Sequence, residues 1–240
     1  MPILSRKART IEGLPIKENS LYGENLCTKS LIYLKIRAPF FLRSPHMNAP
    51  ALHIDPQTSA LVLIDLQYGI VGMNVFPRSS AEVISNASKL VHAFRKHHAT
   101  VVLVSVGNLA DAHDLLNPIT DAPPLSIASR PANFSTLVTE LDIQPSDLLI
   151  TKRQWGAFYG TELDSQLRRR GIKTIVLGGI STNVGVESTA RDAYERSYEQ
   201  VFVEDAMASP SIEAHQGTLK YTFPRLGRTR STQAVIDALG

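Results

Sequence analysis

Three groups of residues in this chain have types and spacing that suit acid–base chemistry on a small molecule. Asp65 follows the apolar run at residues 60–64, Lys152 follows the run at residues 147–151, and a turn rich in glycine and hydroxyl groups occupies residues 178–185. A positioned carboxyl group can move protons, and a neighbouring ammonium group tunes its charge. A turn that enters a helix offers free backbone N–H groups to an anion or a developing oxyanion.

The elements that must position these groups are strands that alternate with helices. Apolar, β-branched runs at residues 60–64, 100–106, 147–151, 173–177 and 200–204 predict buried strands, with a brief strand near 228–230. Helices are expected from Ser79 or Ser80 to residue 97 or 98, and at about 134–141, 161–171, 186–195, from 211 and from 231. This alternation predicts an α/β fold with a parallel sheet covered on both faces, whose ligands bind beyond the carboxyl ends of the strands. All three groups fall at that edge.

The chain divides by composition into an extension and a body. Residues 1–46 hold eight Lys or Arg against three Glu, include four prolines and show no sustained periodicity, so we expect a poorly ordered basic N-terminal extension. An organelle transit peptide, a mis-assigned start before Met47 and a leader added by cloning are all compatible with this composition. Residues 47–240 are expected to form one domain.

Composition also limits the class of protein. The net charge of +3 comes from the extension, so the body gives no reason to expect nucleic-acid binding. No apolar run is long enough to cross a bilayer, and we expect no membrane partner. The single cysteine, Cys27, excludes a disulfide framework and fits a cytoplasmic location. The turn at residues 178–185 lacks the Gly-x-Gly-x-x-Gly fingerprint, which disfavours nucleotide binding, and no cofactor is expected.

The body resembles the isochorismatase-like hydrolase family, which includes nicotinamidases and other cysteine hydrolases that cleave amides. The resemblance covers residues 55–240 and is carried by residues 60–67, by Lys152 with residues 158–163, and by residues 179–193. It implies a single three-layer α/β/α (Rossmann-like) domain with a six-stranded parallel sheet. It also implies a homo-oligomer and a catalytic set of Asp, Lys and Cys.

Carried over by this resemblance, Asp65 is the acid or base and Lys152 is the cation beside it. The third position is Gly185, where the cysteine members have their nucleophile. The motif also places a cis peptide bond between Ile180 and Ser181, and oxyanion-binding N–H groups on Ser181 and Gly185. True isochorismatases also have glycine at this position and hydrolyse a vinyl ether by acid catalysis.

The expected substrate-binding residues surround these three positions. They are Gln67, Trp155, Phe158, Tyr159, Ile180, Ser181, Thr182 and Asn183. The aromatic residues could wall a pocket for a flat substrate or could simply pack. The Asp-x-His metal motif of nicotinamidases is absent, and His92, His97, His98, His113 and His215 are interpreted as isolated or helical surface residues, so no metal is expected.

Several functions therefore remain open at this point. The leading hypothesis is a small-molecule hydrolase that uses Asp65 and Lys152 without a covalent nucleophile, with a vinyl ether of the isochorismate type as one substrate class. The second version has Asp65 activate water on an amide or ester. A non-catalytic member that binds a small ligand, and a scaffold that acts only through oligomer surfaces, are the alternatives from other classes.

Overall fold

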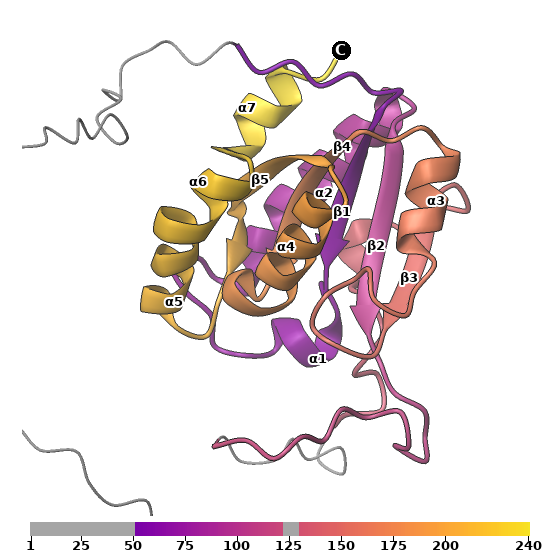
Figure 1. The fold of residues 1–240 in the computed structure, drawn as a ribbon, viewed down its shortest axis with the longest axis vertical. Coiled ribbons are helices and arrows are strands. Elements are labelled where there is room, and N and C mark those ends of the chain that lie inside the picture. Colours follow the sequence, from indigo (N-terminus) through magenta and orange to yellow (C-terminus); the bar gives the residue numbers. More distant parts are fainter. Residues whose placement is uncertain (1–50, 122–129) are drawn as a thin grey trace, which may run out of the picture. The chain divides into compact units, whose positions relative to one another are not determined.

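A six-stranded, all-parallel sheet with the strand order β3-β2-β1-β4-β5-β6 forms the centre of the protein (Figure 1). The computed structural model describes residues 51–121 and 130–240, and the predicted extension at residues 1–46 lies outside that part. The strands are β1 Ser59–Ile64, β2 Thr100–Val106, β3 Leu148–Lys152, β4 Thr174–Ile180, β5 Glu199–Ala208 and β6 Arg228–Arg230. The predicted fold class is confirmed.

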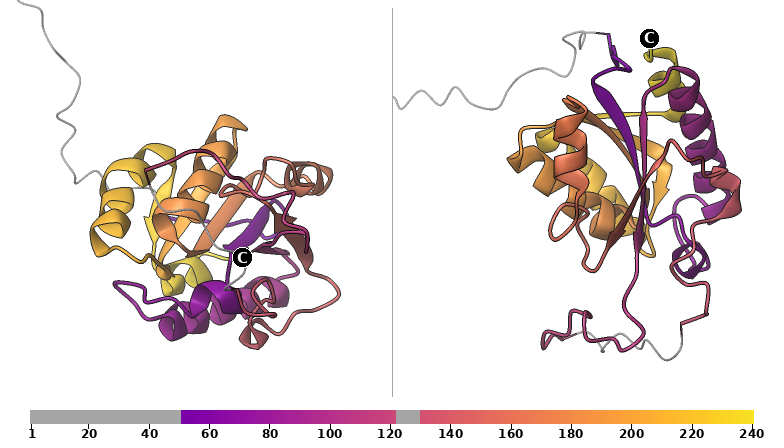
Figure 2. Two further views of the ribbon diagram at one scale, coloured as in Figure 1. Left: turned by 90° about the horizontal axis from the view of Figure 1, so that it is seen from below. Right: turned by 90° about the vertical axis from the view of Figure 1, so that its right-hand side faces the viewer.

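Helices cover both faces of this sheet, as the side view in Figure 2 shows. One face packs against α2 (Ser80–Lys96) and α7 (Thr232–Asp237), and the other against α3 (Leu163–Arg169), α4 (Glu187–Glu195) and α6 (Phe223–Leu226). Shorter helices are α1 (Tyr68–Val71) and α5 (Ile212–Gly217), with single turns η1 (Thr139–Leu141), η2 (Thr182–Val186) and η3 (Thr218–Thr222). No helix of the described residues is long and apolar enough to cross a membrane.

Helix α2 shows how local sequence sets an element. Ser79 caps its N-terminus in a capping box: the Ser79 side chain accepts from the Glu82 N–H, and the Glu82 carboxylate accepts from the Ser79 N–H. The residues predicted to face inward are buried under the sheet, namely Val83, Ile84, Ala87, Leu90, Val91 and Phe94. The predicted start and inner face of this helix are confirmed.

The helix predicted at residues 134–141 is wrong. Only η1 is helical there, because the preceding backbone pairs with the segment that continues β1. The N–H groups of Tyr68 and Gly69 donate to the carbonyl groups of Thr136 and Phe134, and the Val138 N–H donates to Leu66. Backbone groups that serve this pairing are not free to close a helical turn.

The chain between β2 and this paired segment contains no helix or strand among the described residues 107–121 and 130–133. Figure 1 shows it running out beyond the carboxyl ends of β2 and β3. Its Gly107 end is joined to β3 by a hydrogen bond from the Gly107 N–H to the Lys152 carbonyl. The described part of this long connection therefore begins beside the strand that carries Lys152.

Strand β4 is longer than the sequence predicts, because it continues through Gly178 and Gly179 to Ile180. Gly179 has φ of 125°, and a Cβ atom there would collide with the backbone oxygen of Ile64 on the neighbouring strand β1. The glycines therefore do not end the strand. They let β4 approach β1 closely just before the turn that follows.

Candidate active site

Asp65 and Lys152, which are 87 positions apart in the sequence, form a buried ion pair. Asp65 follows β1 and Lys152 ends β3, on either side of β2 in the sheet. Lys152 Nζ lies 2.8 Å from Asp65 Oδ2 and also donates to the carbonyl oxygen of Gln154 at 3.1 Å. Both residues are nearly inaccessible to solvent, with 5% and 2% of their surface exposed. The parallel sheet thus brings together the acid and the cation predicted from the strand ends.

The two oxygens of the Asp65 carboxyl group differ. Oδ2 accepts from Lys152, whereas Oδ1 is buried and has no hydrogen-bond partner among the described residues. Burial raises the pKa of Asp65 from 3.8 to about 6, against the opposing effect of the Lys152 charge. Burial therefore outweighs the ion pair, and the Asp65 carboxyl exchanges its proton near neutral pH.

Gly185 lies directly against this carboxyl group. A Cβ atom at Gly185 would be 3.1 Å from Asp65 Oδ2 and 2.9 Å from Cγ2 of Ile64. It would also be 3.5 Å from the backbone oxygen of Trp155. The structure therefore brings the third predicted position into the same site, in a space too small for a side chain unless its neighbours move.

The turn between β4 and α4 contains the remaining backbone of the site. The peptide bond between Ile180 and Ser181 is cis, at the place that the family motif implies. The chain then forms the wide turn η2, in which the N–H groups of Val184 and Val186 donate to the Ser181 carbonyl at 3.2 Å. The N–H of Ser181 itself makes no hydrogen bond within the described part of the chain. The first N–H groups of such a turn have no acceptor within the turn, so they can donate to a ligand.

Several predicted substrate-binding side chains are occupied by the protein itself. Gln67 is fully buried: its Oε1 accepts from the Val106 N–H, and its Nε2 donates to the carbonyl oxygens of Val106 and Phe134. Ile180 and Thr182 are also fully buried, and Asn183 Oδ1 accepts from Ser209 Oγ at 2.5 Å. Whether any of them also contacts a substrate stays a prediction.

The loop that follows β3 contains Trp155, Phe158 and Tyr159, and these aromatic side chains differ in burial. Phe158 is buried, and its ring stacks on the Tyr198 ring with centroids 5.8 Å apart. The Arg196 guanidinium lies over the Phe158 ring, 5.0 Å from its centroid. Trp155 and Tyr159 are 65% and 75% exposed. Phe158 therefore serves packing, while Trp155 and Tyr159 are free to meet a ligand at the surface.

His215 is a residue beside the site that sequence reasoning missed. It was expected at the surface, but it is 2% exposed and its Nδ1 lies 2.8 Å from Oγ1 of Thr182. A single histidine in a short helix, 33 positions from the turn, gives no sequence signal for this contact. Among the described residues, no group of three His, Cys, Asp or Glu side chains is arranged to hold a metal ion.

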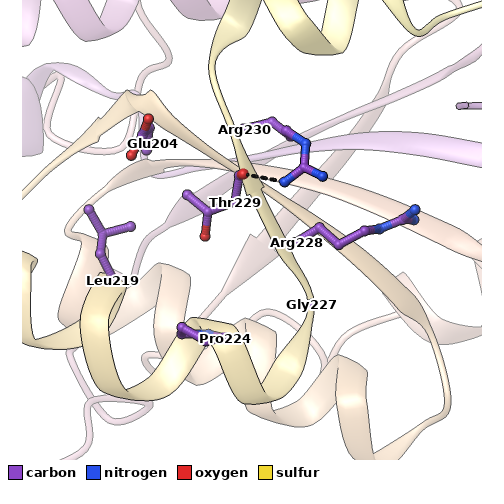
Figure 3. A pocket seen from close by; sticks show the side chains of 7 residues that line it. All are labelled: Glu204, Leu219, Pro224, Gly227, Arg228, Thr229 and Arg230. Atoms are coloured by element: carbon purple, nitrogen blue, oxygen red, sulfur yellow. Dashed lines mark hydrogen bonds between the residues drawn. The ribbon is translucent and has the colours of Figure 1, made fainter. Parts of the chain in front are cut away.

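A hollow of about 490 Å³ lies elsewhere, between β6, the middle of β5, η3 and α6 (Figure 3). It is lined by Glu204, Leu219, Pro224, Gly227, Arg228, Thr229 and Arg230. Figure 3 shows the Thr229 side chain on the Leu219 side of β6 and the two arginine side chains on the opposite side. The hollow shares no residue with the Asp65 site.

Comparison with known proteins places this geometry in context. Residues 59–234 match the model of the isochorismatase domain. YwoC of Bacillus subtilis, an isochorismatase family protein, is 49% identical over 78% of this chain and 96% of its own length. The ureidoacrylate amidohydrolase RutB of Cronobacter sakazakii is 32% identical over 79% of this chain and 91% of its own length. The solved structure of an isochorismatase family protein from Burkholderia thailandensis has a TM-score of 0.73 and 43% identity, and the match covers 78% of this chain and 98% of that one.

Proposed function

We propose that this chain, which belongs to the isochorismatase family of hydrolases, hydrolyses a small molecule through Asp65, without a covalent nucleophile on the protein. The observation that carries this proposal is the state of the Asp65 carboxyl: Lys152 holds Oδ2, while Oδ1 is buried without a partner among the described residues. Burying an unpaired polar atom costs free energy, and such atoms in a native structure often mark a functional group. A pKa of about 6 lets the same group give and take a proton near neutral pH.

The first substrate class is a vinyl ether. The protonated Asp65 gives its proton to the terminal carbon of the alkene, which leaves an oxocarbenium ion. Water adds to the cationic carbon and returns a proton to the Asp65 carboxylate, and the resulting hemiketal breaks into a ketone and an alcohol. This chemistry needs an acid whose pKa is near the working pH, and it needs no group at Gly185. The raised pKa of Asp65 supports it.

The second substrate class is an amide or ester, and similarity to a ureidoacrylate amidohydrolase favours it. Here the ionised Asp65 takes a proton from water, and the hydroxide attacks the carbonyl carbon. The oxyanion of the tetrahedral intermediate would accept a hydrogen bond from the N–H of Ser181, which no group of residues 51–121 or 130–240 occupies. The proton then passes to the leaving amine or alcohol.

The site must open before either reaction can begin. Asp65, Lys152 and Gly185 are all buried, and the Trp155 backbone oxygen would lie 3.5 Å from a Cβ atom at Gly185. Trp155 and Tyr159 are exposed on the same loop, so they are the side chains that a substrate would meet first. We propose that this loop moves aside when a substrate binds.

The test is turnover by the purified full-length chain. The panel contains isochorismate, ureidoacrylate and a set of small amides and esters, with products followed by mass spectrometry. The Asp65→Asn variant should lose turnover, because an amide neither gives nor takes the proton. Asp142→Asn is the matched control, since the Asp142 side chain is 82% exposed. Binding of a panel member without turnover would instead favour the ligand-binding alternative.

The assembly of the chain is a separate part of the proposal. The family resemblance implies a homo-oligomer, and native mass spectrometry of the full-length chain tests this. Complexes of two or more chains are expected, and a monomer at micromolar concentration would contradict this expectation.

A further inference from the structure

A buried contact joins α5 to the turn of the proposed site. His215 lies on α5 with its Nδ1 2.8 Å from Oγ1 of Thr182, the first residue of η2. Both side chains are buried, with 2% and 0% of their surface exposed. A hydrogen bond at such a position is screened little by water, and either partner left alone would carry a desolvation cost.

The neighbours of Thr182 fix the direction of this hydrogen bond. Thr182 Oγ1 also donates to the backbone oxygen of Ala208 at 3.1 Å. A hydroxyl group has one proton, and a carbonyl oxygen can only accept. The Thr182 proton therefore goes to Ala208, and the hydrogen bond to His215 must use a proton on Nδ1. This assigns the Nδ1–H tautomer to the neutral His215 ring.

The state of the ring agrees with this assignment. Burial, and to a smaller degree the Arg78 charge, lower the pKa of His215 below its usual range. The ring is therefore neutral at neutral pH and carries one proton, which is the one donated to Thr182.

The contact also has a clear structural consequence for the turn. Thr182 follows Ser181, whose N–H has no partner among the described residues, and comes three positions before Gly185, which lies against Asp65. Next to Thr182, Asn183 accepts from Ser209 Oγ at 2.5 Å, so the start of the turn is held by α5 and by the end of β5 together. None of these side chains needs to touch a substrate to set the direction of the backbone N–H groups.

We propose that His215 is a positioning residue for the hydrolase site: by donating from Nδ1 to Thr182, it holds the turn whose Gly185 lies against Asp65. This inference rests on the proposed function, because the turn has a catalytic role only if the site is catalytic. It assigns a role to α5, whose sequence contains no part of the family motifs.

Two pairs of variants test the inference through turnover. His215→Leu and Thr182→Val remove the hydrogen bond while keeping similar volume, and His215→Asn and Thr182→Ser can retain it. We expect the first pair to lower kcat about tenfold or more with little change in KM, because misaligned backbone donors weaken transition-state stabilisation. The second pair should keep kcat within a few-fold of the unchanged chain. His92→Leu, an exposed histidine on α2, is the control and should have no effect.

A result in which His215→Leu folds and keeps the kcat of the unchanged chain would overturn the inference. If that variant does not fold, His215→Asn and Thr182→Val decide. Loss of activity in His215→Asn equal to that in Thr182→Val would also contradict it, because the donor would then not be what matters.

Nuclear magnetic resonance separates this inference from the proposed function. The ¹⁵N shifts of the His215 ring should show a proton on Nδ1, and a proton on Nε2 alone would overturn the assignment. Amide exchange at residues 182–186 should become about tenfold faster or more in Thr182→Val, while exchange in β1 stays unchanged. Unchanged exchange in the turn would contradict the positioning role even if no substrate is ever found. Failure of the substrate panel alone would contradict only the proposed function.

Discussion

The Cα atom of Gly185 faces the carboxyl group of Asp65 so closely that a Cβ atom there would be 3.1 Å from Oδ2. Lys152 holds the same oxygen from another direction at 2.8 Å, and Oδ1 stays without a partner among the described residues. The site thus combines a carboxyl group of altered pKa with a neighbour that has no side chain. Each feature leads to a measurable consequence.

The pH dependence of turnover should follow Asp65, whose pKa is raised to about 6. If the acid form is required, as for a vinyl ether, kcat/KM should fall about tenfold per pH unit above pH 6. If the base form is required, as for an amide or ester, kcat/KM should rise up to pH 6 and then level off. The sign of the slope therefore identifies the role of Asp65. A profile that is flat from pH 5 to pH 7 would contradict both roles.

The same pKa makes the fold sensitive to pH. The folded value of about 6 lies above the unfolded value of 3.8, so the folded state holds this proton more tightly. The stabilisation from Asp65 is thus fully present below pH 3.8 and is lost as the pH rises through 6. The unfolding free energy of the wild-type chain, measured relative to that of Asp65→Asn, should therefore fall as the pH rises from 3.8 through 6.

Lys152→Met should destabilise the fold most at high pH. The substitution leaves Asp65 buried without its cation, and breaking such a pair costs about 3–5 kcal/mol when the remaining charge stays ionised. It should also move the pKa of Asp65 above 6, because the Lys152 charge lowers it. At pH 5, where Asp65 is protonated, the cost should be clearly smaller. Urea unfolding at pH 5 and pH 8 measures both values.

The control for this change is Lys89→Met, at an exposed position of α2, which should alter stability by less than about 0.5 kcal/mol. Equal destabilisation by Lys152→Met at the two pH values would show that the ion pair is not what the substitution disrupts.

Gly185→Ala should lower stability by about 1–3 kcal/mol, because the new methyl group would meet Ile64 at 2.9 Å and Asp65 at 3.1 Å. Gly217→Ala is the matched control. Gly217 has the helical φ of −60°, and no atom in the described part of the chain lies within 4 Å of a Cβ atom there, so alanine should stabilise the fold by about 0.5–1 kcal/mol. Thermal unfolding compares the two, and a neutral Gly185→Ala would mean that the site has more room than its geometry indicates.

Trp155 is the single tryptophan of the chain, so its fluorescence reports directly on the loop over the site. At 65% exposure it should emit as a solvated indole in the free protein. A substrate or unreactive analogue that opens the loop should shift the emission, whereas a ligand that binds elsewhere should not. Binding confirmed by calorimetry without any change in emission would contradict the proposed role of the loop.

The sequence was sufficient to predict the sheet and the meeting of Asp65 and Lys152 at one of its edges. Continuous apolar runs mark buried parallel strands, and Asp65 and Lys152 follow two of them, so both had to reach the same edge. The start of α2 was readable from Ser79 and Glu82 because a capping box is local.

Other features depend on contacts that are distant in the sequence. Residues 134–138 pair with the segment after β1 instead of forming a helix. Strand β4 continues through its glycines because Gly179 approaches Ile64 closely. The pKa of Asp65 is set by burial, and the partner of Thr182 comes from α5. None of these has a local pattern, which explains why the helix at 134–141, the end of β4 and the place of His215 were not predicted correctly.

The central claim is that Asp65 carries the reaction and that no covalent intermediate forms on the protein. Intact-protein mass spectrometry during rapid turnover of the best panel substrate, with the unchanged chain and Asp65→Asn side by side, tests it most directly. The account predicts that the mass of the chain stays unchanged at every time point and that Asp65→Asn makes no product. A substrate-derived adduct on the chain, or product formation by Asp65→Asn at the rate of the unchanged chain, would contradict it.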